Sequence, residues 1–341
     1  MIIGCLNETS STENRVTITP STALKLKNLG FEIVIEKNAG LLSGFSDEEY
    51  INADATILTD SNKIIKQSDV IFCIHSLKKQ QLLNIKPHSF IIGNLKDIIN
   101  LNLLNQLKKK SINCLALEKL PRLSRAQPFD ILSSQNNLSG YRAAIEAFVL
   151  SQKVVPMMIT SAGTISPLKF LIIGTGVAGL QAIATAKRLG AKVYANDPRP
   201  EAKEQILSLG AIYLDNFISS IAQFDIIITS AFTPSKRAPI IINQKILKNL
   251  HPYHILIDMA SAFGGNIHGS VDNQLIKTPN GIIYGNSNFA SKVPHSASTL
   301  LSNNFYNFMS YIYSTDKKNI HLNFNDTIIN TIYLTKENNN D

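Results

Sequence analysis

Short apolar runs alternate with amphipathic stretches in the first third of the chain. The runs "EIVIEKNAG", "DVIFCIH" and "SFIIGN" are typical of strands, whereas "SDEEYINADA" and "INLNLLNQLKKKSI" have the spacing of helices. Strands that alternate with helices predict a parallel sheet whose faces are covered by helices. The opening segment is therefore predicted to form an α/β domain.

A second series of the same kind begins near Leu168, after the long helical pattern "YRAAIEAFVLSQKVV". The last helical pattern, "HSASTLLSNNFYNFMSYIYS", follows the final strand of this series, "GIIYGN", so we expect it to return to the first domain. A chain of 341 residues also exceeds what one hydrophobic core usually supports. The prediction is α/β, with two Rossmann-like doubly wound parallel-sheet domains formed by residues 1–135 plus 300–341 and by residues 136–299.

Composition and charge narrow the functional classes. No apolar run approaches the ~20 residues that a membrane-spanning helix needs. The N-terminus has no secretory signal pattern, so we expect a cytoplasmic protein. The formal charge is +8, but the longest basic run is "LKKK" and no basic stripe is interleaved with aromatic residues. This pattern argues against nucleic acid as a partner.

The cysteines carry little chemical signal. Cys5, Cys73 and Cys114 are odd in number, widely spaced and embedded in apolar segments. These features favour reduced packing residues over a disulfide framework or a metal site. We therefore expect buried thiols and no bound metal.

The segment "KFLIIGTGVAGLQAIATAKRLGAKVYANDPR" carries the clearest chemical motif. A buried strand runs into Gly174, Gly176 and Gly179 and then into a helix rich in Ala and Leu. The first glycine permits a tight turn, the second lets backbone amides approach a pyrophosphate, and the third lets the helix pack on the strand. The diphosphate would then lie at the positive end of the helix. The motif predicts dinucleotide binding by Gly174, Gly176, Val177, Ala178 and Gly179.

An acidic residue at the end of the next strand indicates which dinucleotide binds. Asp197 can accept hydrogen bonds from a ribose 2′-OH and repels a 2′-phosphate, which favours NAD over NADP. Arg199, two residues on, could weaken that preference. Further along, "ILIDMASAFGGN" places Gly264 and Gly265 at the carboxyl end of another strand, where they form either a cofactor contact or a plain turn.

The stretch "PRLSRAQPFDILSSQNNLSGYR", from Pro121 to Arg142, is crowded with polar residues but has no clean helical or strand period. With "PMMITSAGTI" and "GVAGLQAIATAKRLGA", it closely resembles the NAD(H)-binding domain of proton-translocating NAD(P) transhydrogenase, the soluble part of its alpha subunit. "ENRVTITP" and "GFEIVIEKNAG" resemble the same superfamily, which includes alanine dehydrogenase. The resemblance covers nearly the whole chain.

The resemblance assigns the polar stretch to a loop beside the nicotinamide. It implies that Arg122, Asp130 and Ser133 hold the nicotinamide carboxamide and ribose, while Gln127 reaches toward the nicotinamide of NADP(H) on a partner. Direct hydride transfer needs two rings held close together and no proton donor, and these side chains can orient a carboxamide. From the residues alone, a plainer interpretation stays open, in which Arg122 and Asp130 pair with each other or with nearby backbone to fix a loop, and Gln127 is solvated.

A function and partners follow from the same resemblance. It implies an NAD(H)-binding catalytic subunit that transfers hydride from NADH to NADP+ on a partner subunit, coupled to proton translocation. It also implies a homodimer that works with a membrane subunit and an NADP(H)-binding subunit on separate chains. Through those partners the protein would be peripheral on the cytoplasmic face of the inner membrane.

Two stretches depart from the family pattern. Only "NFISSIAQF" separates "AIYLD" from "DIIITSAF", where the family has a long insertion with a mobile loop that closes over bound NAD(H). The segment "GNSNFASK" has Ala290 and Lys292 where the family has Pro and Arg. The missing loop leaves open a non-catalytic NAD-binding module.

Alanine dehydrogenase is the other alternative. Arg15 fits its substrate arginine, and Lys78 could serve as its lysine. However, Asn94 stands where a catalytic histidine is expected, and Ser261 and Ala262 stand where an aspartate is expected. Oxidation of an amino acid must also remove a proton, so the absence of both groups argues against this reaction.

Overall fold

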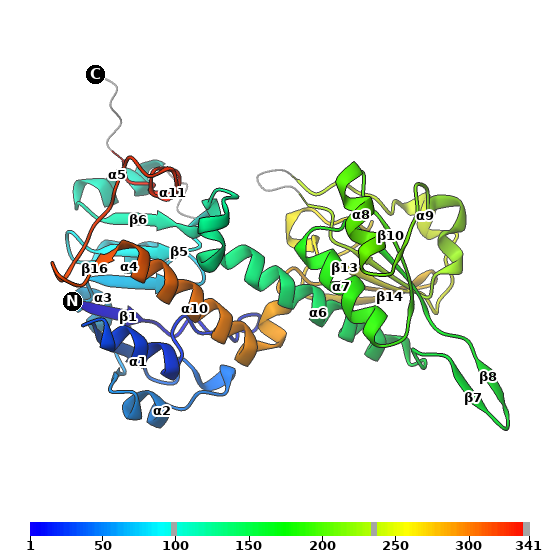
Figure 1. Ribbon diagram of the computed structural model, residues 1–341, viewed down its shortest axis with the longest axis horizontal. Coiled ribbons are helices and arrows are strands. Elements are labelled where there is room, and N and C mark those ends of the chain that lie inside the picture. Colours follow the sequence, from blue (N-terminus) through cyan, green and yellow to red (C-terminus); the bar gives the residue numbers. More distant parts are fainter. Residues whose placement is uncertain (97–100, 233–236, 337–341) are drawn as a thin grey trace, which may run out of the picture. The chain divides into compact units, whose positions relative to one another are not determined.

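The computed structural model describes residues 1–96, 101–232 and 237–336. Its backbone contacts divide the chain into two compact units (Figure 1), Met1–Gln135 with Pro294–Asp341 and Asn136–Val293. The sequence expectation began the returning segment at residue 300, whereas the structure begins it with helix α10 (Pro294–Ile312). The early turns of α10 already contact the first unit, because the Val16 amide donates a hydrogen bond to Ser298 at 2.9 Å.

Within the described residues, the first unit holds a six-stranded parallel sheet in the order β3-β2-β1-β4-β5-β6. The expected helix from residue 99 is described from Leu101 onward, and residues 99 and 100 lie outside the described residues. The strands are β1 (Ile2–Cys5), β2 (Glu32–Glu36), β3 (Thr56–Leu58), β4 (Val70–Cys73), β5 (Phe90–Gly93) and β6 (Asn113–Ala116). The connecting helices are α1 (Pro20–Asn28), α2 (Asp47–Asn52), α3 (Ser61–Gln67), α4 (Lys79–Asn84) and α5 (Leu101–Lys109), with 3-10 turns η1 (Leu41–Ser43) and η3 (Leu117–Lys119).

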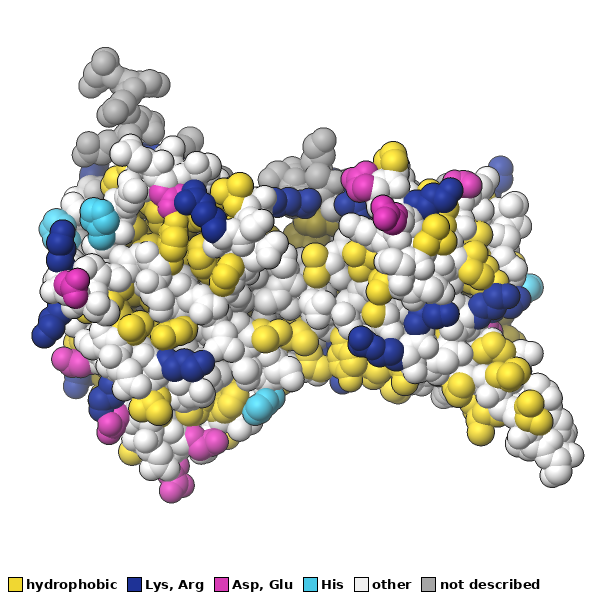
Figure 2. Space-filling view, in the orientation of Figure 1, with side chains coloured by type: hydrophobic (Ala, Val, Ile, Leu, Met, Phe, Trp, Pro, Cys, Tyr) yellow, Lys and Arg dark blue, Asp and Glu magenta, His cyan; other side chains and the backbone are white. Residues whose placement is uncertain are grey.

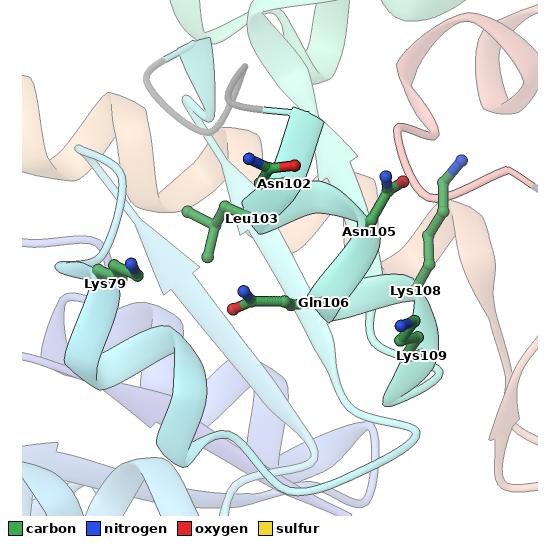
Figure 3. Close-up of a pocket in the computed structure, with 7 residues that line it drawn as sticks. All are labelled: Lys79, Asn102, Leu103, Asn105, Gln106, Lys108 and Lys109. Carbon is green, nitrogen blue, oxygen red and sulfur yellow. The ribbon is translucent and has the colours of Figure 1, made fainter.

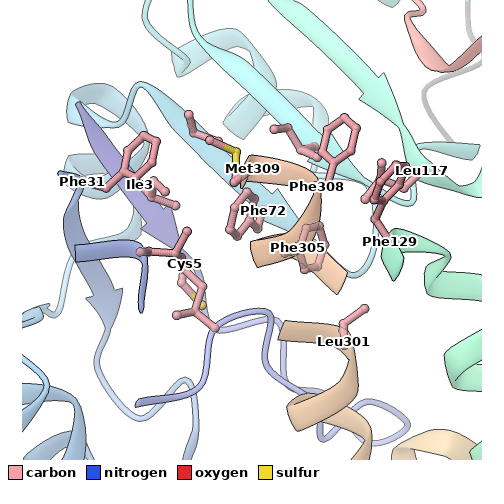
Figure 4. Packing of buried hydrophobic residues seen from close by; sticks show 14 of the residues in the cluster. Ile3, Cys5, Phe31, Phe72, Leu117, Phe129, Leu301, Phe305, Phe308 and Met309 are labelled. Carbon is pink, nitrogen blue, oxygen red and sulfur yellow. The ribbon is translucent and has the colours of Figure 1, made fainter. Parts of the chain in front are cut away.

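Helix α10 supplies much of the core on one face of this sheet (Figure 4). Leu301, Phe305 and Phe308 are buried, and the Phe305 ring stacks on Phe72 of β4 with centroids 4.6 Å apart. Full burial of one such side chain contributes about 1.5–3 kcal/mol. The predicted return of the C-terminal helix to the first domain is therefore confirmed. The chain continues through β16 (Tyr313–Ser314), β17 (Asn319–Ile320) and α11 (Thr327–Ile332).

The described residues of the second unit hold a seven-stranded sheet in the order β11-β10-β9-β12-β13-β15-β14. Strand β9 is buried on both faces, as the unbroken apolar run Phe170–Ile173 predicts for a parallel sheet. The strands are β9 (Lys169–Ile173), β10 (Lys192–Asn196), β11 (Ile212–Tyr213), β12 (Ile226–Thr229), β13 (Ile255–Asp258), β14 (Gln274–Thr278) and β15 (Gly281–Gly285). The helical segments are α7 (Val177–Arg188), α8 (Pro200–Ser208), η5 (Ile218–Gln223), α9 (Gln244–Leu247), η6 (Ser261–Phe263) and η7 (Phe289–Lys292).

The second sheet is mixed rather than purely parallel, because β14 runs antiparallel to β15. Only Pro279 and Asn280 join these two strands, and a two-residue connection can link only antiparallel neighbours. Gly281 has a φ of +135°, and Thr278 donates a side-chain hydrogen bond to its carbonyl at 2.8 Å. The remaining strand pairs of this sheet are parallel, as predicted.

Helix α6 (Ile131–Ser151) begins earlier than the sequence pattern indicated. The sequence showed no period between Pro121 and Arg142, yet this stretch forms the 3-10 segment η4 (Ser124–Phe129) and then the first turns of α6. Asp130 starts the helix, because its carboxylate accepts the Ser133 amide at 2.9 Å. After α6, the chain forms the hairpin β7 (Met158–Thr160) and β8 (Gly163–Ile165).

The three cysteines are buried and unpaired, as predicted. Burial raises the pKa of Cys5 and of Cys114 to about 12, so these thiols stay protonated at neutral pH. Among the described helices, none combines the length and the apolar character that crossing a bilayer requires.

Candidate functional site

The turn between β9 and α7 places three glycines in three different environments. Gly174 has a φ of +87°, and a Cβ there would lie 2.8 Å from the Ala231 amide. A Cβ on Gly179 would collide with the Gly174 carbonyl, so only glycine lets α7 pack this closely on the turn. In contrast, a Cβ on Gly176 would meet no atom within 4 Å. Open space therefore lies beside the start of α7, where the amides of a first helical turn have no partner within the helix.

Asp197 follows β10 and is buried, with 4% of its surface exposed. Its Oδ2 accepts the Thr175 amide at 2.7 Å and the Thr175 hydroxyl at 3.0 Å. Its Oδ1 accepts the Arg199 amide at 3.0 Å and Arg199 Nε at 2.9 Å, while Arg199 Nη2 donates to Oδ2 at 3.0 Å. Burial acts to raise the pKa of Asp197, but the bonds from Arg199 and Thr175 outweigh it and lower the pKa to about 2. The carboxylate is therefore charged and surrounded by donors.

The carboxyl ends of β12 and β13 lie at the same edge of the sheet as the carboxyl ends of β9 and β10. Ser230, directly after β12, donates its hydroxyl to the Gly174 carbonyl at 2.9 Å. Asn266 joins the two loops, because its Oδ1 accepts the Ala231 amide at 3.0 Å and its Nδ2 donates to the Ala231 carbonyl at 2.8 Å. The strand order reverses between β9 and β12, and in open α/β sheets ligands bind at such a reversal, beyond the carboxyl ends of the strands.

Gly264 and Gly265 form a turn that a buried carboxylate organises. Their φ angles are +107° and +74°, which favour glycine. Asp258 at the end of β13 accepts the amides of Asn266 and Ile267 at 2.9 and 3.1 Å. A Cβ on Gly265 would lie 2.9 Å from this carboxylate, so the structure gives Gly265 a turn-forming role independent of any cofactor.

Sequence reasoning missed several residues that shape this edge. Thr175, Ser230 and Asn266 hold Asp197 and the loops, and Gly140 of α6 packs so closely on α7 that a Cβ would collide with the Ala178 carbonyl. Gly140 lies inside α6, but the stretch before Tyr141 showed no helical period, so the sequence did not mark this glycine as a site of close helix packing. The local sequence pattern gave no sign of the roles of Thr175, Ser230 and Asn266 either.

The polar segment before α6 lies in the first unit. Arg122 and Gln127 are exposed, and among the described residues Arg122 has no hydrogen bond or ion pair. Asp130 pairs with Ser133, whose hydroxyl donates to Oδ2 at 2.6 Å. The plainer interpretation therefore holds in part. Arg122 and Asp130 do not pair with each other, but Asp130 binds nearby backbone by accepting the Ser133 amide at 2.9 Å, and Gln127 is exposed.

The predicted site residues belong to two different units. The polar-segment residues lie in the first unit, whereas the glycines of the turn and Asp197 lie in the second. The first group comprises Arg122, Gln127, Asp130 and Ser133, and the second comprises Gly174, Gly176, Val177, Ala178, Gly179, Asp197, Arg199 and Gly265.

Two of the residues considered for an alanine dehydrogenase site, Arg15 and Ser261, donate side-chain hydrogen bonds within the protein. Arg15 donates to Glu13 at 2.7 and 2.6 Å and to Gln135 at 2.8 Å. Ser261 donates to Asp272 at 2.5 Å, so a carboxylate eleven positions further along the chain does lie beside the Gly-Gly turn. That carboxylate also accepts the Ser287 amide at 2.9 Å, which gives it a role in holding the loop.

A cavity of about 680 Å³ lies between α4 and α5 of the first unit (Figure 3). Leu103 and Gln106 of α5 point toward Lys79 of α4. The cavity holds none of the residues that the sequence predicted for the site. Its lining residues are Lys79, Asn102, Leu103, Asn105, Gln106, Lys108 and Lys109.

Two family models match this chain. The model described as "Alanine dehydrogenase/PNT, N-terminal domain" matches residues 4–139, and "Alanine dehydrogenase/PNT, C-terminal domain" matches residues 143–339. The chain belongs to the alanine dehydrogenase/PNT family. Membership in this family agrees with the resemblance found in the sequence and with the α/β fold.

Within the alanine dehydrogenase/PNT family, NAD(P) transhydrogenases are similar to this chain over its full length. A Rickettsia prowazekii protein, named as the first portion of NAD(P) transhydrogenase subunit alpha, is 35% identical over 368 residues, covering 99% of this chain and 95% of that protein. A solved transhydrogenase from Sinorhizobium meliloti is 36% identical with a TM-score of 0.87, covering 93% of this chain and 96% of that one. The alanine dehydrogenase of Bacillus subtilis is 26% identical, covering 89% of this chain and 83% of that protein.

The comparison with the Rickettsia protein also shows a length difference. Its alignment spans 368 residues, whereas this chain has 341, so the relative carries residues without a counterpart here. In this structure, β11, η5 and β12 follow one another directly, which is where the sequence suggested a missing insertion.

Proposed function

We propose that this chain is the NAD(H)-binding catalytic subunit of a proton-translocating transhydrogenase. It transfers hydride from NADH to NADP+ held on a partner subunit. The observation that carries this proposal is the open space at Gly176, the residue before α7 and next to Thr175, whose amide binds the charged Asp197. Relatives that match this chain over 99% of its length are named NAD(P) transhydrogenase.

The residues at this edge fit a dinucleotide. Gly176 leaves room for a pyrophosphate near the first amides of α7, and the positive end of that helix favours an anion. Asp197 supplies acceptor oxygens for ribose hydroxyl groups, while Gly174 and Gly179 keep the turn compact. We therefore assign Gly174, Gly176, Val177, Ala178, Gly179 and Asp197 to NAD(H) binding.

The polar segment fits the nicotinamide end of the reaction. NADH supplies a hydride, and the overall change is NADH + NADP+ giving NAD+ + NADPH, which needs no proton from the protein. We propose that Arg122, Asp130 and Ser133 orient the carboxamide and ribose and that Gln127 reaches toward the ring on the partner. Orientation alone can supply much of the rate enhancement, because two rings held at reacting distance lose little further entropy.

The partners belong to the same proposal. An NADP(H)-binding subunit supplies the second nucleotide, and a membrane subunit carries the protons. Through these subunits the chain would be peripheral on the cytoplasmic face of the inner membrane.

A homodimer is the proposed assembly, and the β7–β8 hairpin is its proposed contact. This hairpin projects from the second unit, and hydrophobic side chains gather on it short of its tip (Figures 1 and 2). Met157, Ile159 and Ile165 are 60%, 75% and 45% exposed. Apolar side chains concentrated on a projecting hairpin are typical of a contact with another chain. We propose that this other chain is a second copy of the same protein.

A non-catalytic NAD-binding module is the second candidate. The shorter chain favours it, because residues missing relative to the Rickettsia protein could include a loop that closes over the nucleotide. This candidate binds NADH but transfers no hydride.

The deciding experiment mixes the full chain with an NADP(H)-loaded partner subunit, NADH and an oxidised NAD analogue. In a catalytic complex, NADP(H) cycles while the analogue is reduced, and absorbance follows the product. We expect transfer that stops when the partner is omitted. NADH binding without transfer would support the non-catalytic module, and NADH oxidation with pyruvate and ammonia would support alanine dehydrogenase.

The Gln127→Asn variant tests the assignment of the polar segment. Shortening the amide by one methylene should lower the transfer rate by about tenfold or more and leave NADH affinity unchanged. Gln223→Asn, at the end of η5, is the matched control. Equal hydride-transfer rates in the natural protein, Gln127→Asn and Gln223→Asn would show that Gln127 has no role in the reaction.

A further inference from the structure

The segment η4 is held along its length by residues from the end of the chain. Two asparagines of α10 donate to one backbone carbonyl: Asn304 Nδ2 to the Pro128 oxygen at 2.8 Å and Asn307 Nδ2 to the same oxygen at 3.0 Å. Asn304 also accepts the Ser134 hydroxyl at 2.6 Å through Oδ1. One buried side chain thus connects η4, the first turn of α6 and α10.

Further contacts hold the residues before and after Pro128. Phe129 is buried, and its ring packs edge-on against Phe308 with centroids 5.5 Å apart. Before the carbonyl, Arg125 donates to Asp326 at 2.7 Å, and the Tyr311 hydroxyl bonds the same carboxylate. These contacts anchor the backbone, whereas the Gln127 side chain is exposed and has no hydrogen bond within the described residues.

We propose that Asn304 and Asn307 are positioning residues for hydride transfer, because they set the place of the Pro128 carbonyl. The residues on either side of that peptide, Gln127 and Asp130, are assigned above to the nicotinamide end of the reaction. This inference rests on the proposed function. It adds two residues that are distant in sequence from the polar segment and that bind it through the Pro128 carbonyl.

Paired amide donors suit this task. Pro128 has no amide hydrogen, so this residue can be fixed through hydrogen bonds only at its carbonyl. Two donors from one helix restrain the direction of the Pro128 oxygen as well as its distance from α10. Because α10 packs in the core, it holds the two donors in fixed places. A misplacement of about 1 Å can cost on the order of a hundredfold in rate.

The test uses Asn307→Ala and the double variant Asn304→Asp with Asn307→Ala in the full chain. Aspartate keeps the size of Asn304 and its acceptor for Ser134 but removes the donor to Pro128. Asn303→Ala, on another face of α10 where the side chain contacts Lys25, is the matched control. Asn307 is only half buried, so its alanine variant keeps the proposal testable if the double variant does not fold.

Two readouts separate positioning from general stability. We expect hydride transfer with the partner at saturating NADH to fall about tenfold or more in the double variant. NADH affinity should weaken about two- to tenfold, and the affinity for ADP-ribose, which lacks nicotinamide, should not change. The Asn303→Ala control should match the natural protein in its transfer rate and in its affinities for NADH and ADP-ribose.

The outcomes distinguish this proposal from the proposed function. If the folded variants keep the natural transfer rate and the natural ratio of NADH to ADP-ribose affinity, the asparagines do not position the segment. If the natural protein shows no transfer, the proposed function fails, and the nucleotide affinities still report on the asparagines. Weaker binding of both ligands to the same extent would indicate a structural role and overturn the proposal.

Discussion

At the residue scale, the ion pair between Asp197 and Arg199 determines whether the Asp197 carboxylate is free to bind a nucleotide. Both oxygens of Asp197 are already engaged by Thr175 and Arg199, so ribose hydroxyl groups must compete with Arg199. The Arg199 side chain is 44% exposed and can leave without unpacking the core. Once displaced, its guanidinium would attract a 2′-phosphate, which a bare carboxylate repels.

Replacement of Arg199 should therefore sharpen the preference for NAD(H). In Arg199→Ala, we expect the ratio of the NADPH to the NADH dissociation constant to rise by about threefold or more. Fluorescence titration of the two reduced nucleotides measures this ratio. Arg188→Ala removes an exposed cation at the other end of α7 and should leave the ratio unchanged; an equal change in both variants would point to overall charge instead.

The same pair predicts a pH dependence of stability. The pKa of Asp197 is lowered from 3.8 to about 2, so the folded state holds this proton less tightly than the unfolded chain. Its stabilisation is fully present above pH 3.8 and is lost as the pH falls through about 2. Asp197→Asn should cost about 1–2 kcal/mol at pH 7, after allowance for the half-exposed Arg199.

Urea unfolding of the natural protein and of Asp197→Asn measures this dependence. The difference in unfolding free energy should stay constant from pH 7 to pH 5 and shrink below pH 4. Asp215→Asn, close in sequence but outside the carboxylate network, is the control. A difference that grows toward low pH would contradict the sign of the shift.

At the element scale, the packing of α6 on α7 joins the connecting helix to the nucleotide turn. Gly140 lies against the Ala178 carbonyl, Ser139 accepts the Ala290 amide at 3.1 Å, and Asn137 donates to Gln181 at 3.1 Å. Close backbone approach of this kind leaves no room for a side chain. The position of the first turn of α7 therefore depends on a glycine in another helix.

A methyl group at this contact should disturb both stability and binding. We expect Gly140→Ala to lower the free energy of unfolding by about 1–3 kcal/mol, although alanine favours a helix, because the added Cβ forces the helices apart. NADH affinity should fall with it. Urea unfolding and NADH titration measure the two effects, and the exposed Asn136→Ala on the same helix is the control. A more stable Gly140→Ala would show that the helices adjust.

At the scale of the whole molecule, the proposed dimer depends on apolar side chains that the monomer leaves exposed. The charged variant Ile159→Asp should weaken self-association by about tenfold or more, because it places a carboxylate in an apolar contact. Analytical ultracentrifugation measures the dissociation constant. Ser161→Asp at the tip of the same hairpin carries the same charge at a polar position and should stay dimeric. A monomeric natural protein would contradict the assembly.

Much of the fold was predictable because its signals are local. The apolar run at β9, the glycines after it and the acidic end of β10 lie within about one supersecondary unit, so pattern and spacing identify them. The start of α6 was not predictable, because the polar residues after Asp130 carry no period. The antiparallel β14 was missed although "TPNG" marks a tight turn.

The amino-acid sequence by itself determined the two α/β series, the dinucleotide motif, the buried cysteines and the family, since each rests on neighbouring residues. Only the tertiary structure decided which residues hold those features in place. Arg199 covers Asp197, Gly140 packs on α7, and Asn304 and Asn307 bind the Pro128 carbonyl. Apart from the Arg199–Asp197 pair, these contacts join positions that lie far apart in the sequence, up to 179 residues. They depend on distances and directions that no local pattern of apolar and polar positions encodes.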